Sequence, residues 1–311
     1  MYDSYKKRLE KKLQIKSLQL NCKIGSPFSP FAISRCLSRY IDSCIFWNPG
    51  FIPPLKTAKK KVVFVHDLCH LHYYGKTKRM YYEFVLKKLY TYVDKIVCIS
   101  EFTKNEFMEW SGIIEDKIEV IPNGIEPDFA SISPPKVFNR PYFFYPGNRR
   151  TYKNVPLMVT AFFTAKMHRK GFDLLLTGAK DDNLVRIASS FCGEPNLKFL
   201  GDISEKELVG YYKGSTGVLY LSKYEGFGLP LLEAMACGRP ILVGRYAAIP
   251  EVAGNAAVYA DLDCLGDITC KIKDIAENRD YIKSIIQQGS IQTQKFNLGT
   301  SAAKLYNTLL N

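Results

Sequence analysis

The sequence lacks any long run of apolar residues. No stretch of about 18 apolar residues occurs, so we expect no membrane-spanning helix. Residues 1–16, MYDSYKKRLEKKLQIK, lack the apolar core of a secretory signal. The nine cysteines include no C-x-x-C pair, so we expect reduced thiols that mostly fill the core. These absences predict a cytoplasmic protein.

Acidic residues are scarce relative to basic ones. The 43 lysines and arginines outnumber the 30 acids, which gives a net charge of +13. Residues 1–140 hold 23 of the basic residues against 14 acids. Such a charge favours nucleic acid or an anionic membrane as a partner, or it is a solvated lysine-rich surface. No zinc-finger, helix-turn-helix or RNP pattern accompanies it, so we expect no nucleic-acid partner.

Strand and helix patterns alternate along most of the chain. A length of 311 residues allows about two domains. Short apolar runs at 62–65, 94–100, 117–121 and 142–145 predict buried strands. Separated by helical patterns, they predict parallel α/β domains. The proline-rich stretch 126–141 predicts the boundary between them. We therefore expect a first domain over 1–138, a second over 139–293 and a terminal helix in 294–311.

Local signals predict several helix starts and turns. Ser204 and Glu207 have the spacing of a capping box, as have Thr103 and Glu106. Asn123-Gly124 is compatible with a hairpin turn. Residues 1–20 form a basic, roughly amphipathic segment, which is either a membrane-surface or partner-binding helix or a helix packed on the edge of a domain.

One stretch combines these signals most densely: Ser222–Pro240, SKYEGFGLPLLEAMACGRP. It lies between two apolar runs, 217–221 and 241–243, each of the length of a buried strand. Pro230 fits the first turn of a helix and Gly238 the position after its end. The stretch therefore predicts strand, glycine-rich loop, helix and parallel strand, with the loop at the carboxyl end of the first strand, where open α/β sheets bind ligands.

Two acids in this stretch suggest the kind of ligand. Glu225 lies in the loop and Glu233 about one turn into the helix. The amides at a helix start attract phosphate, whereas carboxylates accept hydrogen bonds from sugar hydroxyls. Together they favour a nucleotide-sugar site. Taken singly, each acid fits a solvated surface position better than a ligand site, since exposed acids are the norm.

The motif E-G-F-G-L-P-x-L-E-A-M-A-C-G-x-P, with seven residues between its two acids, is similar to the signature of retaining GT-B glycosyltransferases of family 4. The resemblance covers about residues 62–311 and is strongest over 199–257. It implies an α/β protein of the GT-B class, with two Rossmann-like parallel-sheet domains facing a cleft. It also implies a metal-independent, retaining hexosyltransferase that needs no cofactor besides its nucleotide-sugar substrate.

The resemblance also assigns roles to residues. His66, in an H-D-L that follows a strand, lies beside the donor sugar in the family; it is otherwise a structural histidine at a strand end. The loop 146–154 carries the cations expected at the diphosphate. The family's arginine directly precedes its lysine, where this chain has Tyr152, so Arg149 or Arg150 must replace it, and we prefer Arg150. The catalytic residues expected are His66, Glu225, Arg150 and Lys153, and the donor-binding residues are Gly147, Asn148, Arg149, Ile203, Gly226, Phe227, Gly228, Leu229 and Glu233.

No metal site is expected. His66, His70 and His72 lie close in sequence but lack a supporting cysteine or acidic frame. Asp261-Leu262-Asp263 has the form of a D-x-D, yet it falls in a region that lies away from the donor in the family.

The acceptor side is less well defined. Gly25 is the only glycine before Gly50, so the glycine-rich loop that family members carry near the acceptor is missing, and we expect a shortened first domain. The resemblance implies transfer to a glycan or lipid-linked acceptor in cell-surface polysaccharide synthesis, at the inner face of the plasma membrane, with GDP-mannose preferred over a UDP-sugar as donor. The alternative is a non-catalytic or partner-dependent subunit that binds nucleotide sugar, with a partner chain completing the first domain.

Overall fold

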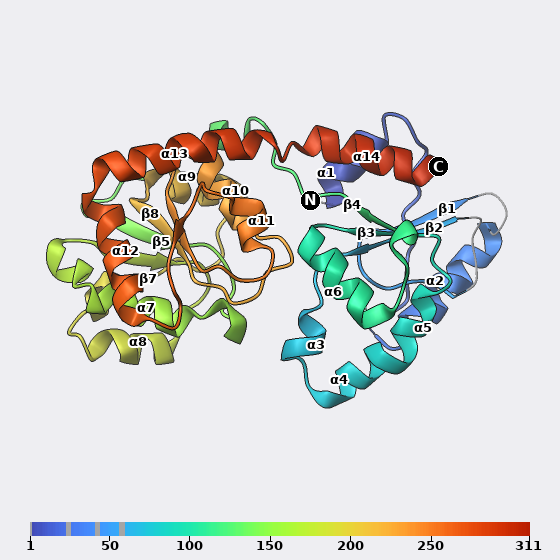
Figure 1. Ribbon diagram of the computed structural model, residues 1–311, viewed down its shortest axis with the longest axis horizontal. Coiled ribbons are helices and arrows are strands. Elements are labelled where there is room, and N and C mark those ends of the chain that lie inside the picture. Colours follow the sequence, from blue (N-terminus) through green and yellow to red (C-terminus); the bar gives the residue numbers. More distant parts are fainter. Residues whose placement is uncertain (1, 23–25, 41–43, 56–59) are drawn as a thin grey trace. The chain divides into compact units, whose positions relative to one another are not determined.

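A computed structural model describes residues 2–22, 26–40, 44–55 and 60–311. The chain forms two compact units, one made of Met1–Gly124 with Leu298–Asn311 and the other of Ile125–Asn297. Each unit is a parallel sheet with helices packed on it (Figure 1), which confirms the predicted α/β class. The domain borders given above, at 138 and 293, stay predictions.

The first unit is built on four parallel strands in the order β1–β2–β3–β4. The strands are β1 (Ile45–Asn48), β2 (Lys60–Val65), β3 (Lys95–Cys98) and β4 (Ile118–Val120). The helices are α1 (Tyr2–Leu9), α2 (Ser29–Leu37), α3 (Cys69–Tyr73), α4 (Lys76–Tyr81), α5 (Lys87–Tyr90), α6 (Glu101–Ser111) and α14 (Leu298–Leu310), with a π-helical turn (Tyr82–Leu86) between α4 and α5.

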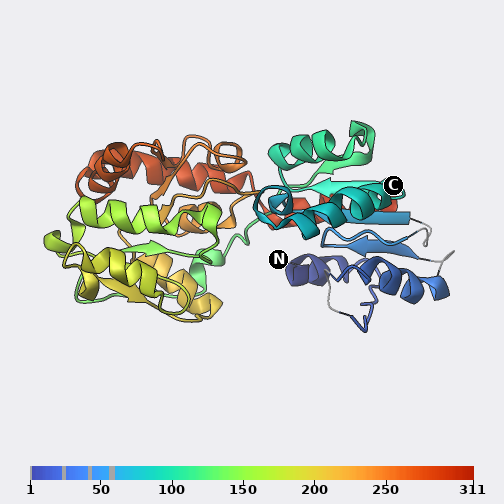
Figure 2. The same cartoon turned by 90° about the horizontal axis from the view of Figure 1, so that it is seen from below.

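Helices cover both faces of this sheet, so β2 is an almost continuous apolar run. Val63 and Val65 belong to a buried cluster that α2, α5 and α6 complete. Phe64 points to the opposite face, where its ring lies 6.3 Å from that of Tyr5 on α1. The two groups of helices are visible on either side of the sheet in Figures 1 and 2.

The two terminal helices of this unit, α1 and α14, pack against each other (Figure 1). Tyr5 and Leu9 of α1 are only 2% exposed. The ammonium of Lys60 donates to the carbonyl oxygen of Thr308 at 2.6 Å, which ties α14 to the start of β2. Of the two alternatives for the N-terminal segment, α1 is therefore the helix packed on the edge of a domain.

The second unit contains six parallel strands in the order β10–β9–β8–β5–β6–β7. They are β5 (Tyr142–Tyr145), β6 (Asp173–Leu176), β7 (Leu197–Phe199), β8 (Gly217–Tyr220), β9 (Ile241–Val243) and β10 (Val258–Tyr259). The chain adds strands on one side from β5 to β7 and on the other from β8 to β10. The order therefore reverses between β5 and β8, and the loops that leave these two strands flank the switch point where open α/β sheets bind ligands.

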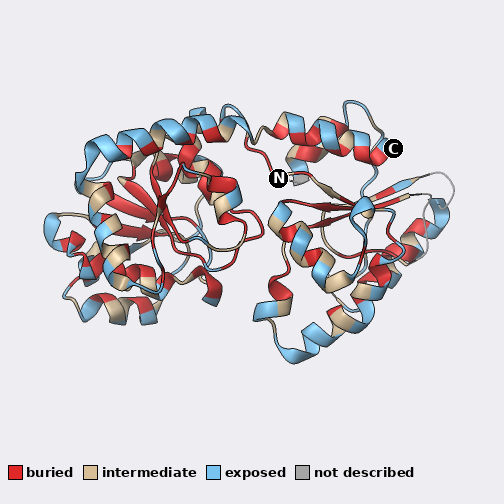
Figure 3. Cartoon of the chain, in the orientation of Figure 1, coloured by how far each residue is buried: buried red, intermediate tan, exposed pale blue. Residues whose placement is uncertain are grey.

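Helices enclose the second sheet, and its central strands β5, β6, β8 and β9 are buried throughout (Figure 3). The helices are α7 (Val155–Thr164), α8 (Asp182–Ser189), α9 (Glu205–Gly214), α10 (Leu229–Ala236), α11 (Ile249–Ala253), α12 (Leu265–Glu277) and α13 (Arg279–Gln294). The capping box predicted at Ser204 and Glu207 is confirmed at the start of α9. Among the described residues, no helix combines the length and apolar character needed to cross a membrane.

Three local predictions were wrong. Ser100, and not Thr103, caps α6: its hydroxyl accepts a hydrogen bond from the amide of Thr103 at 3.0 Å, and Glu106 instead pairs with His72. Asn123-Gly124 makes no hairpin, because β4 pairs only with β3, in parallel. The cysteines are not mostly core filler, since three of the nine, Cys69, Cys98 and Cys237, are buried.

Candidate functional site

The stretch Ser222–Pro240 folds as its sequence predicts. β8, a loop, α10 and β9 follow one another, and β8 pairs with β9 in parallel. Pro230 lies in the first turn of α10, and Gly238, at φ 65°, follows the helix end. Gly228 precedes α10 with φ 92°, and a Cβ there would come within 2.7 Å of a Leu231 methyl carbon. Glycine is therefore required where the loop becomes the helix.

The two charged residues expected at the phosphate and at the sugar form an ion pair. Lys153 Nζ lies 2.6 Å from Glu225 Oε1 and donates a second hydrogen bond to the Tyr220 hydroxyl at 2.8 Å. Both charged side chains are 10% exposed. Lys153 follows β5 and Glu225 follows β8, so the pair joins the two loops that flank the switch point. Because a charge buried alone is costly, each residue compensates the other.

Backbone contacts also tie these two loops together. The carbonyl oxygen of Tyr152 accepts hydrogen bonds from the amide of Lys223 at 2.8 Å and from the hydroxyl of Ser222 at 3.3 Å. The rings of Tyr152 and Tyr224 meet nearly edge to face, with centroids 6.2 Å apart. The residue that stands where the family has an arginine is thus part of the joint between the loops.

Tyr220 lies beneath the ion pair as the last residue of β8. It is 2% exposed, and burial, reinforced by the neighbouring Glu225 carboxylate, raises its pKa far above the ordinary value of a phenol. Its hydroxyl therefore stays neutral and accepts the hydrogen bond from Lys153. The ammonium is thus held by one anionic and one neutral oxygen.

Glu233 has a different environment. It lies half-buried on α10, and its Oε2 accepts a hydrogen bond from the Tyr212 hydroxyl of α9 at 2.7 Å. Burial raises the pKa of Glu233, and the Tyr212 hydrogen bond opposes that rise in part. A carboxylate with a neutral partner keeps its capacity to accept further hydrogen bonds from hydroxyl groups.

The structure distinguishes the two arginines of the loop after β5. The guanidinium of Arg149 donates to the carbonyl oxygens of Thr177, at 2.8 Å, and Ala179, and lies 4.8 Å from the ring centroid of Phe199. Burial lowers its pKa. Arg150 is exposed, with its amide hydrogen-bonded to the Asn148 side chain. Arg149 therefore braces its own loop, whereas Arg150 is the arginine accessible to solvent.

The rest of this loop is held by hydroxyl groups. The Thr177 hydroxyl donates to the carbonyl of Gly147 at 3.0 Å and accepts from its amide at 2.8 Å. The Tyr145 hydroxyl donates to the carbonyl of Asn148. Gly147 and Asn148 thus present a fixed backbone at the end of β5.

The remaining predicted donor residues fall into two groups. Gly226 and Phe227 are buried in the loop that leads to Leu229, the first residue of α10, and the Phe227 ring packs edge-on against Phe296, with centroids 5.6 Å apart. The side chain of Phe227 therefore anchors the loop. Ile203 is half-buried in a third loop, between β7 and α9.

Sequence reasoning missed the tyrosines under this site. Tyr145 and Tyr220 end β5 and β8, and Tyr212 lies on α9. Each hydroxyl contacts one expected site residue: Tyr145 contacts Asn148, Tyr220 contacts Lys153, and Tyr212 contacts Glu233. The sequence signal that could have identified Tyr145 and Tyr220 is a tyrosine at the end of a predicted buried strand. A buried hydroxyl group needs a polar partner, so such a tyrosine predicts a polar contact at the strand end.

The polar residues at the strand ends of the first unit have structural partners. His66 follows β2, and its Nε2 hydrogen-bonds the carbonyl oxygen of Pro49. His70 stacks on Tyr82, with ring centroids 3.6 Å apart, and His72 pairs with Glu106. The three histidines thus have separate surroundings. No group of three or more potential metal ligands occurs in the described part of the chain.

The D-x-D sequence of the second unit is likewise engaged. Asp263 pairs with Lys223 at 2.9 Å and accepts a hydrogen bond from the Tyr246 hydroxyl at 3.3 Å. The hydrogen bond from Lys223 lowers the pKa of Asp263. Asp261 accepts from the amide of Asp263. These contacts give both residues a structural role in this loop.

The chain is similar to known proteins along most of its length. Residues 129–295 match the family described as glycosyl transferases group 1, and residues 38–129 match glycosyltransferase family 4. The O-antigen chain mannosyltransferase B of Escherichia coli is 25% identical over 81% of this chain and 70% of its own length. The O-antigen chain mannosyltransferase RfbU of Salmonella typhimurium is 25% identical over 72% of this chain, which spans 63% of that relative.

Solved structures with the same fold include the Anabaena protein HepE in complex with UDP and glucose, with a TM-score of 0.70 and 17% identity over 80% of this chain and 71% of HepE. Sucrose-phosphate synthase from Thermosynechococcus elongatus has a TM-score of 0.67 and 19% identity over 82% of this chain and 69% of its own. These likenesses confirm the expected GT-B fold.

Proposed function

This chain belongs to the family of glycosyl transferases group 1, and on that premise we propose that it transfers a hexose from a nucleotide sugar to a glycan or lipid-linked acceptor, with retention of configuration. The observation that carries the proposal is the buried Lys153–Glu225 pair, which joins the two loops at the switch point next to the start of α10. It brings a phosphate-binding cation, a hydroxyl-binding anion and a helix N-terminus to one sheet edge.

In this proposal the donor lies along the carboxyl edge of the second sheet. The diphosphate contacts the start of α10, Lys153 and the exposed Arg150. The hexose is held by Glu225 and by the backbone amides of Gly226, Phe227 and Gly228. Glu233 accepts hydrogen bonds from the ribose hydroxyls, and the nucleobase lies against the backbone of Ile203.

Binding of the diphosphate changes the partners of Lys153. Its ammonium can be shared between the incoming phosphate oxygens and Glu225, while Tyr220 fixes its position from below. Glu225, relieved of part of its charge pairing, is then available to the sugar hydroxyls. The site thus exchanges internal partners for substrate, with no charge left buried alone.

Retention follows from reaction on one face of the sugar. The bond between the anomeric carbon and the diphosphate oxygen breaks, and the acceptor oxygen bonds to the same carbon from the same side. The acceptor proton passes to the departing phosphate oxygen. Lys153 and Arg150 stabilise the charge that grows there, so neither a protein base nor a metal is required in this proposal. The role that the family resemblance implies for His66, beside the donor sugar, stays a prediction.

GDP-mannose is our first choice of donor, and a UDP-sugar our second. Two relatives are named as O-antigen chain mannosyltransferases, which favours mannose and a role in cell-surface polysaccharide synthesis. The similar structure of HepE was solved with UDP and glucose, which supports a UDP-sugar as the second choice of donor.

The test is a panel of nucleotide sugars added to the purified chain, scored by thermal shift and by nucleotide release in the presence of a lipid-linked glycan extract. We expect one sugar nucleotide to stabilise the chain and to be turned over, Glu225→Gln to abolish turnover, and the exposed control Asp280→Asn to retain it. Stabilisation without release would favour the partner-dependent subunit. No response to any nucleotide would refute the proposal.

A further inference from the structure

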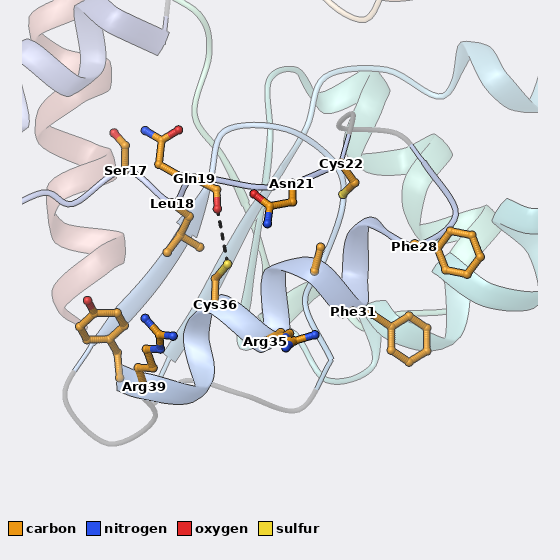
Figure 4. Close-up of a pocket in the computed structure, with 12 residues that line it drawn as sticks. Ser17, Leu18, Gln19, Asn21, Cys22, Phe28, Phe31, Arg35, Cys36 and Arg39 are labelled. Carbon is orange, nitrogen blue, oxygen red and sulfur yellow. Dashed lines mark hydrogen bonds between the residues drawn. The ribbon is translucent and has the colours of Figure 1, made fainter.

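Helix α2 carries aromatic and cationic side chains on the face that it turns away from the core. Phe28, which precedes the helix, is 71% exposed, and Phe31 is 61% exposed. Arg35 and Arg39 follow at helical spacing and are also exposed. Figure 4 shows the two rings at one end of the helix and Arg39 at the other. The exposed face of α2 is thus amphipathic along its length.

This face borders a groove of ≈ 700 Å³ between α2 and residues 17–22. The thiol of Cys36 donates to the carbonyl of Gln19 across it (Figure 4). The lining combines the two phenylalanines and Leu18 with the two arginines. Such a groove offers apolar contact at one end and cations at the other.

A second exposed apolar stripe adjoins the first. Met80 of α4 is 58% exposed, and Phe84 of the π-helical turn is 63% exposed. The hydroxyl of Tyr81 donates to the carbonyl oxygen of Pro27 at 3.2 Å, so α4 touches the residue before Phe28. We call the exposed side chains of Phe28, Phe31, Met80 and Phe84 the aromatic surface; Figure 2 views the molecule from the side on which their helices lie.

Cations surround the aromatic surface. Arg35 and Arg39, both exposed, follow Phe31 at helical spacing. The segment from α4 to α5 has a single acid, Glu83, and it is paired with Lys87. The basic residues of that segment are Lys76, Lys78, Arg79, Lys87 and Lys88.

We propose that the aromatic surface docks this chain on an anionic lipid bilayer. Aromatic and methionine side chains favour the boundary between headgroups and acyl chains, and flanking lysines and arginines favour anionic headgroups. The combination of both on the exposed sides of α2 and of the adjoining α4 segment fits that occupant, because an acidic protein partner needs the charges but not four exposed apolar side chains. The inference deepens the proposed function, whose acceptor can be lipid-linked.

Co-sedimentation of the full chain with vesicles tests the docking without donor or acceptor. We expect binding to phosphatidylcholine vesicles that contain phosphatidylglycerol, weak binding to phosphatidylcholine alone, and release by salt. Phe28→Ser with Phe31→Ser should lower the affinity by about tenfold or more, as should Arg35→Glu with Arg39→Glu. The matched controls Ile291→Ser and Arg186→Glu with Lys206→Glu, exposed in the second unit, should bind as the unchanged chain does.

Equal binding by all variants, or equal binding to neutral and anionic vesicles, would overturn the proposal. So would a dimer that the Phe28 and Phe31 substitutions dissociate while vesicle binding is absent, since the aromatic surface would then face a second copy. The donor-induced thermal shift is measured on the same proteins. A chain that docks on vesicles but shows no shift with any nucleotide sugar would refute the proposed function and leave the docking intact.

Discussion

The strand-end loops of the two sheets use their polar residues in opposite ways. In the second unit, Lys153 and Glu225 pair with each other through side chains that come from different loops. In the first unit, His66 bonds a backbone carbonyl and Ser100 caps α6. A substrate can replace a side-chain partner, whereas replacing a helix cap exposes the backbone. In our proposal the Lys153–Glu225 pair of the second unit exchanges partners with a ligand, whereas the contacts of His66 and Ser100 hold the backbone of the first unit.

Removing the cation should have the largest effect. Lys153→Met leaves the Glu225 carboxylate buried without its partner, so we expect a loss of about 3–5 kcal/mol in the free energy of unfolding. Turnover should fall by about 100-fold or more, since the leaving phosphate loses a cation. Denaturant unfolding and initial rates give the two numbers.

The double variant Lys153→Met with Glu225→Leu separates these effects. Replacing both charges by apolar groups should restore most of the stability and none of the turnover. Recovery of turnover in the double variant would show that the pair is structural, as the polar contacts of the first unit are.

Acid should weaken the first unit through His70. Burial, with a smaller contribution from His72, lowers the pKa of His70 from 6.5 to about 3. The unfolded chain then binds a proton that the folded chain does not, so stability is present above pH 6.5 and is lost as the pH falls towards 3, by at most about 1.4 kcal/mol per pH unit. His70→Phe should remove this loss; an unchanged pH dependence of unfolding would refute the assignment.

Removing one hydroxyl beneath the ion pair should have a smaller effect. Tyr220→Phe deletes the neutral acceptor of Lys153 and should cost about 1–2 kcal/mol in stability, with kcat/KM lower by about tenfold. Tyr142→Phe is the matched control, because the Tyr142 hydroxyl donates to the carbonyls of Lys136 and Tyr211 in the same unit but touches no donor residue. Tyr142→Phe should lower the stability but leave kcat/KM unchanged. An equal loss of kcat/KM in the two variants would mean that the Tyr142 and Tyr220 hydroxyls both act through folding.

The smallest effect is expected at the helix cap. Ser100→Ala removes the acceptor for the Thr103 amide and should cost about 1 kcal/mol in stability. Because this is a backbone contact of the first unit, affinity for nucleoside diphosphate should not change. A marked loss of that affinity, measured by calorimetric titration, would contradict the difference that we infer between the strand-end loops of the two units.

Sequence alone predicted the parts of this molecule that local chemistry determines. Pro230, Gly228 and Gly238 specify how α10 begins and ends, and the capping box at Ser204 starts α9. The same rules failed at Thr103, because two hydroxyl residues three positions apart compete for one helix start and Ser100 is the one with extended backbone.

Contacts between distant residues could not be predicted from such rules. Lys153 and Glu225 are 72 positions apart, and nothing in either loop states that they pair. The hydrogen bonds of Tyr212 to Glu233 and of Tyr220 to Lys153 depend on how α9 and β8 pack in the folded unit, which the sequence does not state. Likewise a π-helical turn, Tyr82–Leu86, interrupts the segment from α4 to α5, and only the packed structure shows which apolar side chains of this segment stay exposed.

The central claim is that the Lys153–Glu225 pair marks a site for the diphosphate of a nucleotide sugar in the second unit. Calorimetric titration of GDP and UDP into the unchanged chain, Lys153→Met and Ser100→Ala tests it most directly. We predict that one nucleotide binds the unchanged chain and Ser100→Ala with the same affinity and binds Lys153→Met at least about tenfold more weakly. Equal affinity for all three proteins would contradict the claim.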